Sequence, residues 1–275
     1  MKTVYMLPLA ALMALASCDN IDEADRFIPV ERPESDKVIL IEEFTGARCV
    51  NCPTGAATVA DLHEQYPGQV VAVSLYPEQM ASLTAPITTD LRTTVASDIF
   101  SAFDGTSKGL PAAMFDRSTF NGSVLQLTVT QWPSFVYDLL SNQTSPVNIA
   151  LETAYNESSR ELTVNYNVDF LSAVNEEVSF QLYITEDGIE SMQLTPTGMD
   201  TKYINNHVLR AALNGTWGTS LGSLTLAGQQ KSGSATVTLK DDWKAENCNV
   251  VGFLARTGDK TVLQAAETHV VPAAE

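Results

Sequence analysis

The hydrophobic pattern of residues 37–143 mixes short apolar runs with apolar side chains at helical spacing. Residues 37–44 and 70–75 each hold a run of aliphatic residues, which is typical of a strand buried on both faces. Between them, residues 53–66 place apolar side chains at helical spacing, and Pro53 suits the first turn of a helix. This order of strand, helix and strand predicts a βαβ unit with two parallel strands.

Two more helices and one more strand are predicted in the same part of the chain. Residues 88–103 and 130–142 carry apolar side chains three or four positions apart. Leu110 and Pro111 stand directly before a short apolar strand at 112–115. The first part of the chain is therefore expected to have an α/β architecture.

From Ser145 the hydrophobic period changes to two residues. Apolar and polar side chains then alternate, as in strands that bury one face. The alternating segments are 147–155, 162–168, 178–184 and 235–239, and the segments 249–255 and 261–268 have the pattern of a hairpin across residues 257–259. They predict an immunoglobulin-like β-sandwich over 146–275, while the stretch 186–232 is expected to hold a helix or a long loop. The predicted fold class is α/β plus all-β, with an α/β domain at 37–145 followed by the sandwich.

The start of the chain has the pattern of a signal peptide at residues 1–17. Lys2 is followed by an apolar core that is too short to span a bilayer and then by small residues. The tetrad Leu15-Ala16-Ser17-Cys18 resembles the bacterial lipobox, which implies cleavage before Cys18 and acylation of its thiol. An ordinary signal peptide followed by a chance cysteine is the alternative. Residues 18–36 are acidic and poor in apolar side chains, which predicts a tether.

The charge of the chain argues against one large class of partners. Its 275 residues carry a formal net charge of −17. Nucleic-acid binding needs clustered Lys and Arg to neutralise phosphates, so no nucleic-acid partner is expected. The same charge argues against peripheral binding to anionic lipids. The lipid on Cys18 is therefore the expected contact with a membrane.

Cys49 and Cys52 form the candidate chemical site. They stand in a Cys-Val-Asn-Cys sequence between the first predicted strand and the first predicted helix. The amino end of a helix carries a partial positive charge that stabilises a thiolate at Cys49, and Arg48 adds positive charge beside it. Cys52 would lie one turn inside the helix, close enough to attack a mixed disulfide on Cys49. A CxxC motif that opens a helix in a βαβ unit is typical of a redox site.

This part of the chain resembles the thioredoxin superfamily. The resemblance rests on the CxxC motif, on Leu110-Pro111 placed like the cis-proline loop of that fold, and on Glu43, six residues before Cys49. It implies that Cys49 attacks a disulfide, that Cys52 resolves the mixed species and that Glu43 assists proton transfer. It also implies a cis bond before Pro111, where Leu110 would present backbone to a substrate strand.

The whole chain resembles the family of twenty-eight-kilodalton outer-membrane proteins. The lipobox, residues 42–46 before the CxxC motif, the Asn51-Cys52-Pro53 triplet, the appended sandwich and residues 206–210 carry this resemblance. It implies a lipoprotein in the outer membrane, held by the lipid on Cys18 and facing the periplasm or the cell surface.

The cysteine pair also has interpretations without redox activity. Cys49 and Cys52 could form a static disulfide or half of a metal site. A structural zinc site needs four Cys or His ligands, and His63, His207 and His269 show no ligand spacing, so no metal site is expected.

Other candidates have structural interpretations as well. Glu43 could be a surface acid at the end of a strand, and His207 fits an ordinary core or surface histidine. Cys248 is expected to be a buried apolar residue on a strand. Arg48 stands where thioredoxins usually have an aromatic residue, and Glu43 where they have Asp.

Two functions of different classes fit these features, and neither requires a cofactor. The first is a membrane-tethered thiol–disulfide oxidoreductase that acts on thiols or disulfides of exported proteins. The second is a non-enzymatic surface binding or scaffold lipoprotein whose β-sandwich recognises a protein or a glycan. The intact cysteine pair and Pro111 favour the first function. Arg48 and the large appended sandwich favour the second.

Overall fold

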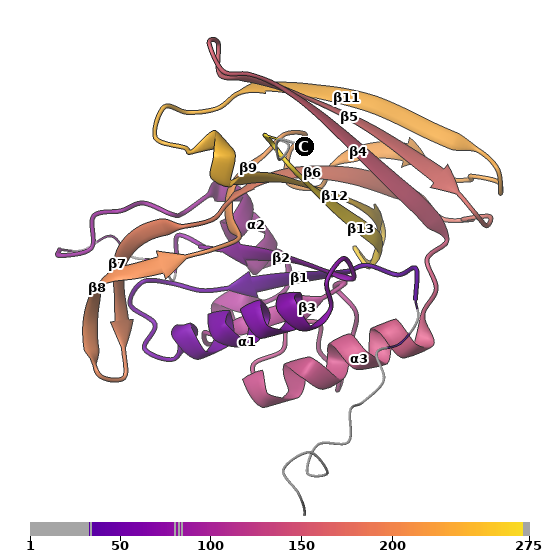
Figure 1. Cartoon of the computed structure of the whole chain (residues 1–275). Helices are drawn as coiled ribbons and strands as arrows, with labels where there is room; N and C mark the ends of the chain where they lie inside the picture. Colours follow the sequence, from indigo (N-terminus) through magenta and orange to yellow (C-terminus); the bar gives the residue numbers. More distant parts are fainter. Residues whose placement is uncertain (1–32, 34, 80, 82, 84, 272–275) are drawn as a thin grey trace, which may run out of the picture. The chain divides into compact units, whose positions relative to one another are not determined.

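The computed structural model describes residues 33, 35–79, 81, 83 and 85–271 (Figure 1). The predicted signal peptide, Cys18 and nearly all of the predicted tether lie outside the described residues. Within those residues, no helix combines the length and the apolar character that crossing a bilayer requires.

The predicted βαβ unit is present, and its two strands are parallel. It consists of β1 (Ile39–Phe44), α1 (Cys52–Gln65) and β2 (Val70–Leu75). Every residue of both strands is buried, because apolar side chains cover both faces of the sheet. Pro53 lies in the first turn of α1, where the missing N–H of proline costs no helical hydrogen bond.

The other predicted helices are present with shorter bounds. The elements that follow β2 are α2 (Thr94–Ala102), β3 (Ala112–Phe115) and α3 (Trp132–Asn142), with short 3₁₀ helices at Gly105–Ser107, Val129–Gln131 and Ala245–Asn247. β3 pairs antiparallel with β1. α1 and α3 cover one face of the sheet, and α2 covers the other.

Strands dominate the chain after residue 145. They are β4 (Val147–Asn156), β5 (Glu161–Phe170), β6 (Val178–Glu186), β7 (Ile189–Thr195), β8 (Gly198–Asn205), β9 (Val208–Ala212), β10 (Thr219–Gly222), β11 (Gln230–Thr238), β12 (Cys248–Arg256) and β13 (Val262–His269). The expectation of a helix or a long loop at 186–232 is wrong, because β7, β8, β9 and β10 occupy this stretch. β7 buries polar side chains at alternate positions, so its sequence lacks the apolar alternation of a strand.

One sheet connects the two parts of the chain. Its strand order is β13-β12-β6-β9-β2-β1-β3, with β10 also paired to β6. The junction is short: β2 and β9 pair at Ser74 and Val208, and the Ser74 N–H donates to the His207 carbonyl over 2.7 Å. A second sheet, β11-β5-β4, packs on the β6 and β12 end of the first through a common apolar core (Figure 1). The fold is thus mixed and strand-rich, as the sequence predicts.

A second core lies where the two parts of the chain meet. Leu40, Phe44 and Ile99 from the first part pack in one buried cluster with Leu209 and Phe253 from the second. Residues 33–275 accordingly form one compact unit. The domain boundary near 145 stays a prediction about which segments fold alone.

Candidate functional site

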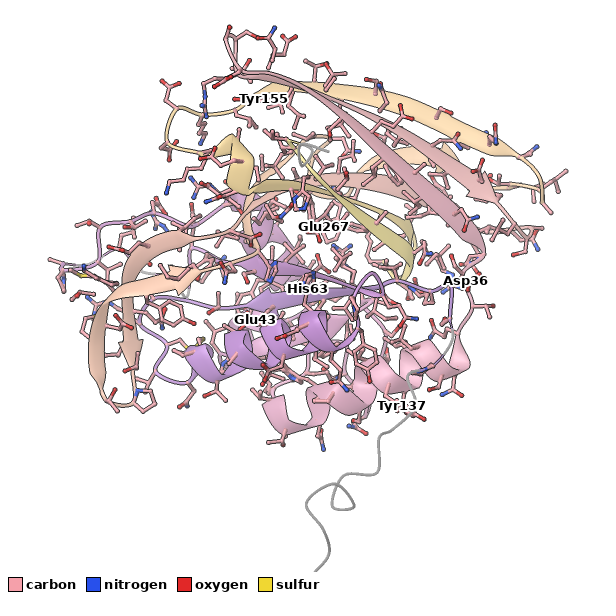
Figure 2. The ribbon with its side chains drawn as sticks, viewed as in Figure 1. Asp36, Glu43, His63, Tyr137, Tyr155 and Glu267 are labelled. Carbon is pink, nitrogen blue, oxygen red and sulfur yellow. A yellow bond between two sulfur atoms is a disulfide. The ribbon has the colours of Figure 1, made fainter. Side chains whose placement is uncertain are left out.

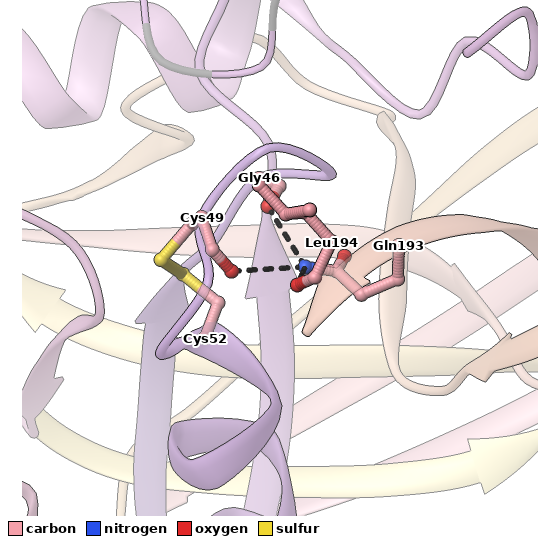
Figure 3. Close-up of a disulfide and its surroundings, with 5 residues drawn as sticks. All are labelled: Gly46, Cys49, Cys52, Gln193 and Leu194. Atoms are coloured by element: carbon pink, nitrogen blue, oxygen red, sulfur yellow. Dashed lines mark hydrogen bonds between the residues drawn. A yellow bond between two sulfur atoms is a disulfide. The ribbon is translucent and has the colours of Figure 1, made fainter. Parts of the chain in front are cut away.

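Cys49 and Cys52 form a disulfide with their Cα atoms 5.3 Å apart (Figure 3). Two successive turns shape the loop around it. The Cys49 N–H donates to the Gly46 carbonyl over 2.9 Å, and the Cys52 N–H donates to the Cys49 carbonyl over 3.2 Å. Both cysteines therefore lie at the amino end of α1, as predicted. Cys52 is the first residue of the helix, however, and does not lie one turn inside it.

The two sulfur-bearing residues differ in exposure. Cys52 is 1% exposed, whereas Cys49 is half-buried and is flanked by the exposed residues Arg48 and Val50. The partial positive charge of the α1 amino end favours negative charge at this position. The geometry therefore makes Cys49 the sulfur that a second molecule can reach.

Glu43 is buried beside Cys52. Both residues line a cavity of about 280 Å³ between the carboxyl ends of β1 and β2 and the start of α1. No hydrogen bond of good geometry reaches either carboxyl oxygen of Glu43 from the described residues, although the Ser74 hydroxyl lies near the carboxyl group. Burial raises the pKa of Glu43 to about 8. The Ser74 hydroxyl offsets only part of this rise. The interpretation of Glu43 as a surface acid is wrong, because its side chain lies inside the protein, as Figure 2 shows.

The remaining walls of this cavity are polar and aromatic. Tyr76 from the end of β2 and Tyr203 and Asn205 from β8 line it. The Tyr76 hydroxyl donates to Asn205 Oδ1 over 2.7 Å. Burial and the nearby Glu43 carboxyl raise the pKa of Tyr76, so its hydroxyl keeps its proton. The cavity thus joins the βαβ unit to a strand from the second part of the chain.

Gly55 allows α1 to lie directly against Glu43 and Pro111. A Cβ atom at Gly55 would stand 2.8 Å from Glu43 Oε1 and 2.9 Å from Pro111 Cβ, closer than real Cβ contacts. The Leu110–Pro111 bond is cis, as expected. Leu110 and Pro111 also line a shallow pocket with Asn51 of the CxxC motif. Four of the predicted site residues and Leu110 are therefore gathered around the first turn of α1.

Arg48 is the predicted site residue whose role the geometry supports least. Its side chain is exposed, and Nη2 donates to the Ala85 carbonyl over 3.2 Å. The guanidinium thus reaches toward the loop after β2. An effect of Arg48 on the Cys49 thiol stays a prediction.

Sequence reasoning missed Gln193, which contacts the CxxC loop from β7. Its Nε2 donates to the Cys49 carbonyl over 3.0 Å and to the Gly46 carbonyl over 3.3 Å (Figure 3). The side chain is 2% exposed. A lone glutamine in an irregular pattern gives no local signal of such a role. The contact follows from the path of the chain 144 residues after Cys49.

Two histidines that show no ligand spacing in the sequence lie together. The rings of His63 and His207 have centroids 5.1 Å apart, and His63 Nε2 lies 3.8 Å from Glu267 Oε2. Figure 2 shows His63 on α1 and Glu267 close to it. The nearby Glu267 carboxylate raises the pKa of His63, whereas burial lowers the pKa of His207.

The described part of the chain contains no group of three or more His, Cys, Asp or Glu side chains arranged to hold a metal ion. Cys248 is fully buried on a strand, as predicted, at the start of β12 in the apolar core that the two larger sheets share. Burial raises the pKa of its thiol to about 12, so it is unreactive at neutral pH. Cys18, the predicted lipid site, lies outside the described residues.

The family comparison decides the identity of the chain. The model of the outer membrane protein Omp28 family matches residues 100–273, which is more than half of the chain. The chain belongs to the Omp28 family. This confirms the family resemblance and the predicted location in the outer membrane. The match begins after the CxxC motif, so membership in the Omp28 family does not by itself assign redox chemistry to Cys49 and Cys52.

Two solved structures show a similar fold at low identity. The Omp28-family chain is similar to HBP35 of Porphyromonas gingivalis, with a TM-score of 0.67, 15% identity and coverage of 88% of this chain and 78% of that one. It is also similar to protein AGR_C_4864 from Agrobacterium tumefaciens, with a TM-score of 0.54, 13% identity and coverage of 88% and 98%. A domain of the outer membrane lipoprotein Omp28 from Porphyromonas gingivalis gives a TM-score of 0.35 at 21% identity, over 48% of this chain and 93% of that one. No curated protein matches the chain.

Proposed function

We propose that this outer-membrane protein is anchored by a lipid on Cys18 and exchanges disulfides with exported proteins through Cys49 and Cys52. In this proposal residues 37–145 act as a thioredoxin-like unit. The observation that carries the proposal is the cavity shared by Cys52 and Glu43. A carboxyl group buried without a partner is costly, and strongly shifted pKa values gather at functional sites.

The exchange needs no reactant other than the protein and its substrate, because the bonds, electrons and protons balance between them. A thiolate of a substrate dithiol attacks Cys49 Sγ, the bond between Cys49 and Cys52 breaks, and Cys52 leaves as a thiolate. The second substrate thiolate then attacks the sulfur bound to Cys49 and releases it. The substrate is oxidised to a disulfide, and the protein disulfide is reduced to a dithiol. Two protons pass from the substrate thiols to Cys49 and Cys52, and the reverse sequence reduces a substrate disulfide.

Glu43 suits the proton step at Cys52. Its pKa of about 8 lies close to the ordinary thiol pKa of about 8.5, and proton transfer is efficient between groups of similar pKa. As Cys52 leaves, the protonated carboxyl supplies a proton through the shared cavity. When Cys52 must attack, the carboxylate takes the proton back. Glu43 can thus serve both directions of the exchange.

The range of the family match favours a second candidate function. The Omp28 family model covers residues 100–273, the strand-rich part of the chain, and leaves the CxxC motif outside. This favours a binding or scaffold lipoprotein whose sandwich recognises a protein or a glycan. In that function the disulfide is static.

Trapping of mixed disulfides in cells separates the two functions. Cys52→Ser removes the resolving sulfur, so partners that reach Cys49 should stay attached and appear as reducible adducts. Cys49→Ser should trap few or none, because Cys52 is buried. Cys248→Ser is the control and should behave like the parent chain. An absence of adducts in Cys52→Ser would favour the binding function.

A further inference from the structure

A hairpin from the second part of the chain lies against the CxxC loop. β7 and β8 pair with each other and form a separate two-stranded sheet. Figure 1 shows this hairpin near the start of α1, where the chain arrives from β1. The hairpin is not needed to complete either of the two larger sheets, so its position calls for another explanation.

Three hydrogen bonds join the hairpin to the loop. Gln193 donates to the carbonyls of Cys49 and Gly46, as described above. The Leu194 N–H donates to the Ala47 carbonyl over 2.8 Å. These bonds fix the backbone of the residue that carries the more exposed sulfur, because the Cys49 carbonyl accepts from both Gln193 and the Cys52 N–H.

The same hairpin forms one wall of the cavity that contains Cys52. Gln193, Tyr203 and Asn205 line this cavity opposite the start of α1. Its volume of about 280 Å³ admits water molecules and is far too small for a polypeptide chain. The side chain of Cys52 is 1% exposed behind this wall.

We propose that the β7–β8 hairpin covers Cys52 and so limits disulfide exchange to attack at Cys49, with Gln193 as the positioning residue. A substrate must then approach from the side of Val50 and Leu110, which the hairpin leaves open. The covered thiol attacks only the mixed disulfide on Cys49, because external disulfides cannot reach it. This inference rests on the proposed function, since covering a resolving thiol matters only if the pair exchanges.

Alkylation of the reduced protein tests this role directly. The full chain is reduced, treated with iodoacetamide for increasing times, and digested, and mass spectrometry then follows Cys49 and Cys52 separately. In the parent chain Cys49 should react and Cys52 should stay protected. In Gln193→Leu, Cys52 should react several-fold faster, because the hairpin is no longer held on the loop.

Gln181→Leu is the matched control. Gln181 is also 2% exposed and also donates through Nε2, to Asn214 Oδ1 and the Gly215 carbonyl, away from the CxxC loop. It should leave the protection of Cys52 unchanged. If Gln193→Leu fails to fold, Tyr203→Ala removes part of the cavity wall without touching the bonds of Gln193. It should also raise the alkylation rate of Cys52.

Two results would overturn the inference. One is a Cys52 that reacts as fast as Cys49 in the parent chain. The other is parental protection of Cys52 in both Gln193→Leu and Tyr203→Ala. The alkylation readout uses no protein substrate, so it separates this inference from the proposed function. Protection that depends on the hairpin shows that the hairpin covers Cys52, whereas an absence of trapped adducts in Cys52→Ser would contradict the proposed function and leave that covering in place.

Discussion

The carboxylate of Glu42 and the guanidinium of Arg117 form a buried two-pronged ion pair, with Nε 2.6 Å from Oε2 and Nη2 2.7 Å from Oε1. Arg117 also lies over the rings of Trp217 and Phe253 from the second part of the chain. The pair therefore links β1 to the shared core. Its carboxylate belongs to the residue directly before Glu43.

Glu42→Gln should destabilise the protein strongly. The neutral amide leaves the Arg117 guanidinium buried without its counter-charge, which typically costs about 3–5 kcal/mol. Urea unfolding at neutral pH measures this loss. Glu161→Gln is the control, because Glu161 is exposed on β5 and its change should cost little. A loss at Glu42 as small as that at Glu161 would show that the ion pair contributes little to stability.

Glu43→Gln should change how stability depends on pH. The pKa of Glu43 is 4.5 in its ordinary state and about 8 in the folded protein. Between these values the folded state keeps a proton that the unfolded state has lost, so the parent chain loses stability as pH rises through this window. The loss begins near pH 4.5, below which both states are protonated, and is complete above about pH 8.

Glutamine does not titrate, so Glu43→Gln lacks this loss of stability. Its stability relative to the parent chain should therefore rise from pH 5 to pH 9, by on the order of a few kcal/mol. Urea unfolding at several pH values measures the difference, with Glu161→Gln as the comparison. Parallel pH curves for Glu43→Gln and the parent would mean that Glu43 titrates normally.

Cys18→Ala should release the protein from membranes. Several acyl chains hold a protein firmly, since each buried methylene contributes about 0.8 kcal/mol. Labelled fatty acid should enter the parent chain and Cys248→Ala, but not Cys18→Ala. Continued labelling of the Cys18 variant in the membrane fraction would contradict the lipobox assignment.

The separated fragment 37–145 should be less stable than the intact chain. The fragment 37–145 loses the partner of β2 at Ser74 and the apolar side chains of the shared core, including Leu209 and Phe253. Its melting temperature should lie well below that of the intact chain. Equal melting temperatures would show that the shared core contributes no stability to the first part.

Features encoded by neighbouring residues could be predicted from the sequence. The strands at 70–75 and 112–115 have the predicted bounds, because a short, mainly apolar run bounded by turn residues leaves few alternatives. The position of Cys49 and Cys52 at the start of a helix follows from the CxxC motif and Pro53. These features need no knowledge of distant parts of the chain.

Features that depend on distant residues could not be predicted. The burial of Glu43 results from Gly55, which brings α1 against it, and from the wall that β8 adds. Gln193 reaches the CxxC loop from a strand whose buried positions are polar. His63 and His207 meet only because β2 and β9 pair. The spacing of residues along the sequence does not predict these long-range contacts.

The reduction potential of the Cys49–Cys52 disulfide tests the central claim most directly. It is measured on the purified protein by equilibration with glutathione buffers and quantification of both thiols. Disulfide exchange with exported proteins predicts a potential in the range of known exchange proteins, about −120 to −270 mV. A potential below about −300 mV, typical of static structural disulfides, would contradict the proposed exchange function.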